Sequence, residues 1–364
     1  MLSRKQLKVI WVGPIVGPSH LSKYKAVSPA ANKWQMNFIT SLMKQGIQVI
    51  NVSYLPEQIF PKGRLFPYYK QHNDSIFSIQ SKYINLPKLK NVTLGANIFK
   101  EISKHNDSEV VITYNNYIPH TKAASLAKKK YNMKWVNIVA DDNFVEGPDL
   151  TLFLSYGYFL KSEISPKMHI DGGLYPLTKD DYKPKRSVIL FSGALNKWTG
   201  IEEFAEQFLK LDQRQFELHI YGKGDSILLR KLSASDRIKL KGFVSDEELE
   251  KSMQECFAFV NPRPIDIPGG ENNFPSKLLE YLRYGKPVIS TKTAGIAPYY
   301  DNVLYYYDPL DTSSLVSTIN KLSNLDDNDM KLHRHNIEKL YSNHNWNSIS
   351  DSFLKKIKSL WFKE

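Results

Sequence analysis

The sequence has a single cysteine and no long hydrophobic run among its 364 residues. Cys256 therefore cannot form a disulfide within the chain, and its place in an apolar, strand-like run predicts a buried structural thiol. The longest apolar runs, at 187–195 and 256–260, are far shorter than the ~20 residues of a membrane-spanning helix. The basic start lacks a signal-peptide core, because apolar residues 9–12 are followed directly by glycine and proline. We therefore expect a cytoplasmic protein that does not cross a bilayer.

Positive charge is abundant but confined to one half of the chain. Residues 1–170 contain 22 Lys and Arg against 10 Asp and Glu, whereas residues 171–364 contain 27 of each, so the first half carries the whole net charge of +12. Clustered Lys and Arg attract nucleic acid or an anionic membrane surface without any sequence readout. A basic surface that only keeps the protein soluble explains the asymmetry equally well.

The alternation of short apolar runs with helical segments predicts two α/β domains. The length suits about two domains of roughly 150 to 200 residues, and 42% hydrophobic with 24% charged residues is typical of a globular chain. β-Branched runs predict strands at 7–13, 47–54, 109–114, 134–140 and 150–155, and again at 187–192, 216–221, 237–242, 256–261 and 287–291. We expect a Rossmann-like, doubly wound sheet in each domain, with ligands at the carboxyl ends of the strands.

The composition of two segments sets the expected domain boundaries. The Pro- and Lys-rich stretch 176–186 is the best linker, which gives an N-terminal domain at 1–175 and a C-terminal domain at 176–343. The last segment, 344–364, is expected to form an amphipathic helix with lysines opposite its apolar face. We expect this helix to pack back on the N-terminal domain, although the pattern also suits a membrane surface.

The stretch 260–291 carries the clearest chemical signal. Its pattern predicts a strand, a loop, a helix with Pro275 at its first position, a turn and a strand. A helix N-terminus offers free N–H groups and partial positive charge, to which Ser276 and Lys277 add a hydroxyl and an ammonium. Glu280, one turn further on, can accept hydrogen bonds from both hydroxyls of a ribose. Phosphate and ribose together indicate a nucleotide, whereas a capped helix with a solvated Glu280 is the simpler interpretation.

The chain resembles the retaining glycosyltransferases of family 4, which have the GT-B architecture of two Rossmann-like domains facing across a cleft. The resembling segments follow the family's order along essentially the whole chain and are SPAAN at 28–32, FSGAL at 191–195, YGKG at 221–224, KGFV at 241–244 and FPSKLLEYLRYGKPVIST at 274–291. The resemblance implies a C-terminal domain that binds a UDP- or GDP-linked sugar and an N-terminal domain that binds the acceptor. It also implies catalysis without a metal ion or any other cofactor.

The resemblance also implies where the donor sugar and its ribose are held. Glu280 matches the family's acid on the donor ribose. The family's other acid stands eight positions earlier, where this chain has Asn272 preceded by Glu271, so either residue is expected at the donor sugar.

The donor diphosphate is expected to meet side-chain cations. The family's arginine position in the second domain is occupied by Ala194, so Lys197, Lys277 and Arg263 are expected to offset the charge of the leaving diphosphate. The other donor-binding residues that the matching loops imply are Gly17, Gly193, Gly222, Phe243, Val244, Phe274, Pro275 and Ser276.

Two acids end the predicted strand 134–140. Relatives often place a His or Asp facing the donor sugar here, so Asp142, next to Asp141, is expected to be catalytic. His120 is a weaker candidate, because a histidine after such a strand is more often a solvated loop residue. The sequence shows no metal-ligand cluster, Walker loop or Ser-His-Asp arrangement.

Basic and aromatic residues mix in the segment FPKGRLFPYYK at 60–70. Lys62 and Arg64 with Phe66, Tyr68 and Tyr69 suit an anionic bilayer interface, the lining of an acceptor cleft, or a plain surface loop. Such mixtures also bind single-stranded nucleic acid, but the sugar-transfer motifs favour a lipid-linked glycan and no nucleic-acid partner.

These observations predict a glycosyltransferase of cell-surface polysaccharide biosynthesis that acts at the inner face of the membrane. It would move a hexose or N-acetylhexosamine to a glycan or polyprenyl-linked acceptor. Asn272 stands where the family has an acid, and Ala194 stands where it has an arginine. The alternative is therefore a non-catalytic subunit of the same fold that binds a partner or glycan. A sugar-nucleotide epimerase of this architecture would need acid–base pairs that the sequence does not show.

Overall fold

The computed structural model describes residues 6–362 except 18–20, 22–23, 25, 69–75, 142–143, 180–184, 225–226 and 268–271, and except the side chains of 185–186. Contacts divide the chain into two compact units. Unit 1 comprises Met1–Leu154, Tyr158–Ile170 and Trp346–Glu364, and unit 2 comprises Ser155–Gly157 and Asp171–Asn345. The boundaries thus lie at 170/171 and 345/346, whereas the sequence placed them at 175/176 and 343/344.

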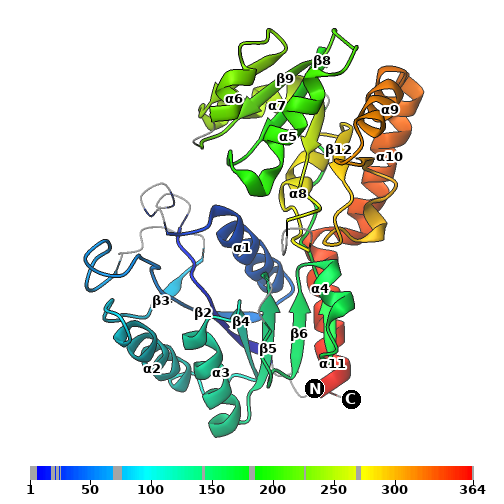
Figure 1. The fold of residues 1–364 in the computed structure, drawn as a ribbon. Coiled ribbons are helices and arrows are strands. Elements are labelled where there is room, and N and C mark those ends of the chain that lie inside the picture. The colour runs from blue at the N-terminus through cyan, green and yellow to red at the C-terminus, as the bar shows by residue number, and fades with distance from the viewer. Residues whose placement is uncertain are drawn as a thin grey trace. The chain divides into compact units, whose positions relative to one another are not determined.

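Unit 1 is built around a parallel sheet (Figure 1). Within the described residues it has seven strands in the order β3-β2-β1-β4-β5-β6-β7. Their bounds are β1 (Lys8–Val12), β2 (Gln48–Ser53), β3 (Ser78–Gln80), β4 (Val110–Tyr114), β5 (Lys134–Val139), β6 (Leu150–Phe153) and β7 (Lys167–His169). The five strands that the sequence predicts for this half are all present. The strands β3 and β7 were missed because each has three residues and lies at a sheet edge.

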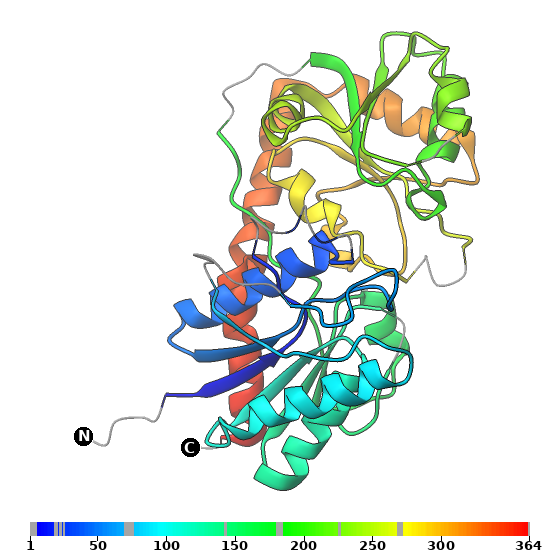
Figure 2. The same cartoon turned by 90° about the vertical axis from the view of Figure 1, so that its left-hand side faces the viewer.

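Helices cover both faces of this sheet (Figure 2). Helices α1 (Pro29–Lys44) and α11 (Trp346–Trp361) pack on the face that buries Trp11, and α2 (Leu89–Ser103) and α3 (Ile118–Tyr131) pack on the face that buries Ile10. Successive residues of a strand point to opposite faces, which is why β1 is apolar from Val9 to Val12. Helix α11 lies along α1, with the Phe38 and Phe353 ring centroids 5.5 Å apart. The short α4 (Tyr156–Lys161) follows β6.

Unit 2 repeats this architecture. Its described residues form a six-stranded parallel sheet in the order β10-β9-β8-β11-β12-β13. The strands are β8 (Lys185–Ser192), β9 (Glu217–Tyr221), β10 (Ile238–Gly242), β11 (Cys256–Asn261), β12 (Val288–Thr291) and β13 (Tyr305–Tyr307). Helices α5 (Ile201–Leu209), α6 (Ile227–Leu232) and α9 (Thr312–Ser323) cover one face, and α7 (Asp246–Glu255), α8 (Lys277–Leu282) and α10 (Asp327–His344) the other. The predicted pair of Rossmann-like sheets is therefore confirmed.

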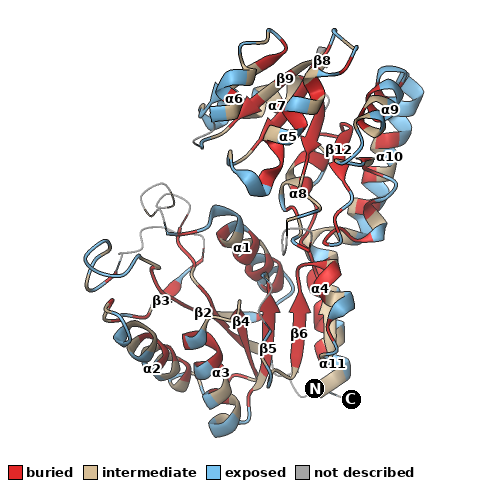
Figure 3. Ribbon diagram, in the orientation of Figure 1, coloured by how far each residue is buried: buried red, intermediate tan, exposed pale blue. Residues whose placement is uncertain are grey.

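Both sheets are buried on both faces (Figure 3). Cys256 is one of the buried residues, and burial raises the pKa of its thiol to about 12, so the predicted structural role is confirmed. No helix in the described part of the chain is both long and apolar enough to cross a membrane.

The start of α8 differs from the sequence prediction. The helix begins at Lys277 rather than at Pro275. The backbone N–H of Leu278 donates to the carbonyl of Pro275 at 2.9 Å, which is the i to i+3 bond of a turn. The last loop residues before α8 are therefore wound more tightly than an α-helix, and α8 itself spans six residues.

The strand order fixes where a ligand site is expected in each unit. The order reverses direction between β1 and β4 in unit 1 and between β8 and β11 in unit 2. At such a switch point, the loops that leave the two neighbouring strands diverge and leave room for a ligand at the carboxyl edge of the sheet.

Candidate functional site

The carboxyl-edge loops of unit 2 are tied together by their backbones. The N–H of Gly193 donates to the carbonyl of Tyr221 at 3.0 Å, that of Leu195 to Lys223 at 2.9 Å, and that of Gly222 to Gly242 at 2.8 Å. Gly222 has a φ of 142°, and a Cβ there would lie 1.7 Å from the carbonyl oxygen of Gly193. The loops after β8, β9 and β10 therefore form one backbone layer, and only glycine fits at position 222.

Two cations meet at the switch point of unit 2. Lys197 begins the turn Lys197–Thr199, and Arg263 follows β11. The Nη1 of Arg263 donates to the carbonyl of Trp198 at 2.8 Å, and Gly200 packs so closely that a Cβ would lie 1.8 Å from the carbonyl oxygen of Pro262. Burial lowers the pKa of the Arg263 guanidinium, and a partly desolvated cation attracts an anion more strongly than a hydrated one. The structure thus places Arg263 against the turn that Lys197 begins.

Helix α8 adds an ammonium and a carboxylate. The Nζ of Lys277 lies 2.7 Å from Oε2 of Glu280, and both side chains are partly exposed. Ser276 precedes the helix without a side-chain capping bond. Because α8 has six residues, its dipole is short, and Lys277 rather than the helix end carries the positive charge here.

Tyr281 positions α8 and was missed by the sequence reasoning. Its hydroxyl donates to the carbonyl of Ser192 at 3.0 Å and accepts from the N–H of Ser192 at 2.9 Å. Its ring stacks on Phe259 with centroids 4.4 Å apart, and burial raises the pKa of the phenol. The buried hydroxyl fixes the distance between Glu280 and the Gly193 loop. The available signal was a tyrosine in the apolar stripe of α8, since a buried phenol needs a partner.

Asn272 lies in a packed segment of unit 2. It is 5% exposed, and its backbone carbonyl accepts a hydrogen bond from the hydroxyl of Ser155. A Cβ at Gly157 would lie 2.8 Å from Oδ1 of Asn272, so the amide packs on the backbone of 155–157. Glu271, the alternative sugar contact, lies outside the described residues.

The remaining unit 2 residues differ in exposure. Phe243 is 72% exposed, and the Nζ of Lys223 lies 4.0 Å from its ring centroid. Val244 is partly buried against the core, and Phe274 packs on Tyr300 with ring centroids 5.8 Å apart. Phe243 is therefore the aromatic side chain of this group that a ligand can reach.

The loop after β1 in unit 1 is held by side chains. The amide of Asn32 accepts from the N–H of Val16 and donates to its carbonyl, both at 2.9 Å. Ser53 bonds the backbone of Ile15 in the same reciprocal way, at 2.7 and 3.0 Å. Gly17 follows as a buried residue. Asn32 ends the SPAAN motif, which explains why that motif positions this loop.

A pocket of about 420 Å³ lies at the switch point of unit 1, and we call it the switch-point pocket. Its lining includes Pro14 after β1, Asn115 after β4 and Asp141 after β5. Asn115 has a φ of 61°, which is unusual for a residue other than glycine. Its amide donates to Asp141 at 2.6 Å and accepts from the N–H of Ala140 at 3.1 Å, so the strained residue fixes the carboxylate. Asp142 lies outside the described residues.

His120 lines the same pocket and is not the solvated loop residue that the sequence suggested. It sits on α3, is 1% exposed, and its ring lies 5.5 Å from that of Tyr54 and 5.3 Å from that of Tyr117. Burial lowers its pKa to about 4, so the imidazole is neutral at pH 7. Nδ1 lies 3.0 Å from the carbonyl of Tyr114, which can only accept, so Nδ1 carries the proton and Nε2 is a bare acceptor. Nε2 has no hydrogen-bond partner among the described residues.

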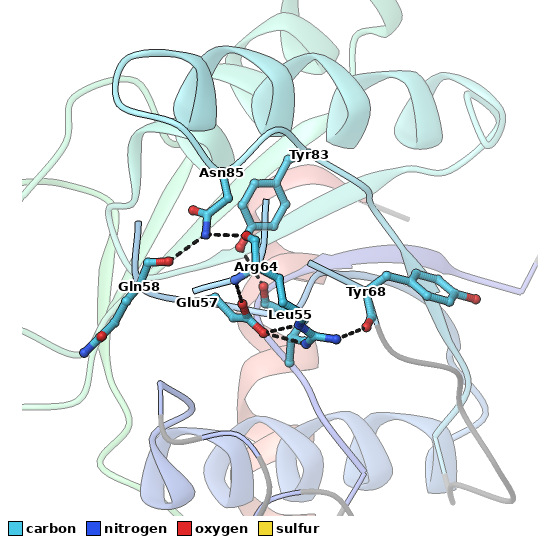
Figure 4. A network of polar contacts seen from close by, with 7 residues as sticks. All are labelled: Leu55, Glu57, Gln58, Arg64, Tyr68, Tyr83 and Asn85. Carbon is cyan, nitrogen blue, oxygen red and sulfur yellow. Dashed lines mark hydrogen bonds and ion pairs between the residues drawn. The ribbon is translucent and has the colours of Figure 1, made fainter. Parts of the chain in front are cut away.

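The segment 55–68 is an ordered loop (Figure 4). The amide of Asn85 donates to the carbonyls of Gln58 at 2.6 Å and Arg64 at 2.9 Å. Arg64 donates through Nε to Glu57 at 2.6 Å, and this hydrogen bond raises the pKa of the guanidinium. Asn85 and Glu57 are the positioning residues that sequence reasoning missed.

The predicted acceptor or membrane residues lie on this loop. Lys62, Phe66 and Tyr68 are exposed on it, and Arg64 is held by Glu57. Tyr69 lies outside the described residues. Nowhere in the described part of the chain do three or more His, Cys, Asp or Glu side chains gather into a possible metal site.

Comparisons with known proteins bear on the fold and on unit 2. Residues 186–324 match the family model of the group 1 glycosyl transferases. Over 120 residues the chain is 28% identical to the amylovoran biosynthesis glycosyltransferase AmsK of Erwinia amylovora. This match covers 32% of this chain and 30% of that protein, so the chain aligns with less than a third of the relative's length.

Solved structures share the whole architecture. Sucrose-phosphate synthase from Thermosynechococcus elongatus is similar with a TM-score of 0.67 and 15% identity, over 98% of this chain and 99% of that chain. Anabaena HepE in complex with UDP-glucose is similar with a TM-score of 0.63 and 13% identity, over 97% and 100% of the two chains. The two parallel sheets of this chain thus have the GT-B fold of these structures, and the group 1 match lies within unit 2.

Proposed function

We propose that this chain is a glycosyltransferase that moves a hexose or N-acetylhexosamine from a nucleotide-diphosphate sugar to a glycan acceptor. The observation that carries the proposal is the group of Lys197, Arg263 and Lys277 with Glu280 in unit 2, within the segment that matches the group 1 glycosyl transferases. Cations suit the diphosphate, and the carboxylate suits the ribose. The structural relative HepE, which was solved with UDP-glucose, supports a nucleotide sugar as donor.

The positive charge at the donor diphosphate comes from side chains. The backbone N–H groups of Gly193, Leu195 and Gly222 already donate to neighbouring loops, so these amides are not free to bind phosphate. Lys197, Arg263 and Lys277 therefore stabilise the negative charge that develops on the leaving nucleotide diphosphate. This mechanism needs no metal ion.

Asp142 and either Asn272 or Glu271 act at the donor sugar in this proposal. No side chain is assigned as a nucleophile, so retention of configuration would follow from attack by the acceptor on the face that the diphosphate leaves. Asn272 is buried, so its part is to orient a hydroxyl or to position the loop that carries Glu271.

Unit 1 takes the acceptor. Its switch-point pocket presents aromatic rings, the Asp141 carboxylate and the neutral His120, which suits hydroxyl groups of a sugar. Lys62, Arg64, Phe66, Tyr68 and Tyr69 support a lipid-linked acceptor at the inner face of the cell membrane, in capsule or lipopolysaccharide assembly. The similarity to a protein named for amylovoran biosynthesis supports a polysaccharide pathway.

Donor binding tests the proposal. Thermal shifts are measured with UDP-, GDP- and dTDP-sugars, and hydrolysis of the stabilising donor is then followed. We expect stabilisation by one nucleotide sugar, slow hydrolysis, and loss of both in Glu280→Ala but not in Glu338→Ala, an exposed glutamate on α10. No response to any nucleotide would favour the non-catalytic subunit instead.

A further inference from the structure

Three neighbouring pockets of unit 1 differ in chemistry. The switch-point pocket has no lysine or arginine among its described lining residues. A second pocket of about 530 Å³, the basic pocket, is lined by Lys62, Arg64 and Glu57. A third of about 470 Å³, the apolar pocket, is lined largely by carbon atoms of Phe66, Tyr68 and their neighbours.

The pockets follow one another in a row. Ala26 and Pro56 line both the switch-point pocket and the basic pocket, so these two share a wall. Arg64 lines the basic pocket, and its Nη1 donates at 2.9 Å to the carbonyl of Tyr68, which lines the apolar pocket. The basic pocket therefore lies between the other two.

The loop that separates the pockets is built to hold its shape. Gly63 approaches Gln58 so closely that a Cβ would lie 2.1 Å from its carbonyl oxygen. Glu57 fixes the guanidinium of Arg64, which also donates to the carbonyl of Tyr68 and contacts the side chain of Tyr24. Lys62 makes no ion pair with any described residue. The basic pocket thus presents a fixed guanidinium and one ammonium to an anion.

We propose that this row binds one amphiphile, a sugar joined through a diphosphate to a polyisoprenoid chain. The sugar occupies the switch-point pocket, Lys62 and Arg64 bind the diphosphate, and the apolar pocket takes the first isoprene units. The order of the pockets, first one with hydrogen-bonding groups and no cation, then a cationic one, then an apolar one, matches the order of groups along such a molecule. This inference rests on the proposed function and names its acceptor class, and it places a single lipid molecule, rather than a bilayer surface, in the pockets.

Farnesyl diphosphate, which has the diphosphate and three isoprene units, is a probe for two of the three pockets. Its affinity is measured by isothermal titration against inorganic diphosphate. We expect farnesyl diphosphate to bind at least about tenfold more tightly, because the chain buries apolar surface. The charge change Lys62→Glu should weaken both probes about tenfold, and Phe66→Ser should weaken only farnesyl diphosphate.

Matched measurements locate the site. Lys129→Glu places the same charge change on the exposed surface of α3 and should leave both affinities unchanged. Phosphatidylglycerol vesicles test the bilayer alternative. Vesicle binding without any affinity for farnesyl diphosphate would overturn the proposal. Farnesyl diphosphate binding that neither Lys62→Glu nor Phe66→Ser weakens would also overturn it, because the probe would then bind at the unit 2 cations.

The nucleotide-sugar thermal shift on the same samples separates this inference from the proposed function. A protein that a nucleotide sugar stabilises but that binds farnesyl diphosphate no better than inorganic diphosphate is a glycosyltransferase without this lipid site. A protein that shows the expected lipid binding and no nucleotide response keeps the lipid site and loses the proposed donor function.

Discussion

The two switch points occupy equivalent places in two similar sheets but have opposite electrostatic character. In unit 2 the switch point gathers Lys197 and Arg263, and Lys277 lies on nearby α8. In unit 1 the corresponding pocket holds the Asp141 carboxylate and the neutral His120. The net charges of the two halves show the opposite trend, since residues 1–170 carry the whole net charge of +12. Bulk charge therefore describes the exterior of each half, and the loops at the switch points decide what each site binds.

The two sites are also held by different means. In unit 2, the loops are joined by backbone hydrogen bonds and approach so closely that Gly222 must be glycine. In unit 1, the side chains of Asn32, Ser53 and Asn115 hold the loops. A glycine-dependent site is sensitive to any added side chain, whereas the unit 1 site depends on specific amides and hydroxyls.

The largest expected effect comes from Gly222→Ala. The new Cβ would lie 1.7 Å from the carbonyl oxygen of Gly193, so the loops must separate. We expect the free energy of unfolding to fall by about 4 kcal/mol, measured by urea titration. Gly242→Ala is the matched control, because Gly242 has a φ of 68° but nothing within 4 Å of a Cβ, and it should cost only about 1 kcal/mol. Equal effects would show that backbone conformation, not loop contact, requires Gly222.

The next effect concerns the cations of unit 2. Arg263→Ala should lower the rate of sugar transfer about a hundredfold, because it removes charge that stabilises the leaving diphosphate. Lys251→Ala, an exposed residue of α7 in a weak pair with Glu255, serves as the control and should leave the rate within about twofold. An unchanged rate in Arg263→Ala would place the diphosphate elsewhere.

His120 makes the stability of unit 1 depend on pH. Its folded pKa is about 4 and its ordinary value is 6.5, so between these values the unfolded chain binds the extra proton and acidification destabilises unit 1. We expect a loss of about 1.4 kcal/mol per pH unit across that window. Urea titrations of wild type and His120→Gln at pH 7, 6 and 5 measure it, and parallel curves for the two proteins would contradict the assignment.

Asp171 makes the stability of unit 2 depend on pH in the opposite direction. Burial raises its pKa to about 7 although the hydroxyl of Tyr299 lies 2.5 Å away. The folded chain therefore holds a proton that the unfolded chain releases above the ordinary value of 3.8, and stability falls as the pH rises from about 4 to 7. Asp171→Asn should remove this slope while Asp301→Asn, a partly exposed residue, should not.

The sequence predicted the fold because periodicity reports burial. All ten predicted strands are present. The edge strands β3, β7 and β13 were not predicted, because a strand of three residues is too short to show a clear hydrophobic pattern. Charged residues that follow predicted strands, such as Arg263, could also be found from the sequence, because the ligand-binding residues of a parallel sheet lie in the loops at its carboxyl edge.

The positioning residues could not be predicted in the same way. Tyr281 bonds Ser192, and Asn85 bonds Gln58 and Arg64, across separations in the chain that depend on tertiary packing. His120 was misread because a histidine after a strand has no local signal for burial against two tyrosine rings. Such contacts follow from the fold and not from any spacing in the sequence.

In the proposed function, the anionic donor binds at the switch point of unit 2. Isothermal titration of the stabilising nucleotide sugar at low and high salt tests it most directly, with wild type, the double variant Arg263→Ala Lys277→Ala, and Lys129→Glu in basic unit 1. We predict that salt weakens wild-type binding, that the double variant loses it, and that Lys129→Glu binds as wild type does. A double variant with wild-type affinity would contradict the claim and place the nucleotide away from these cations.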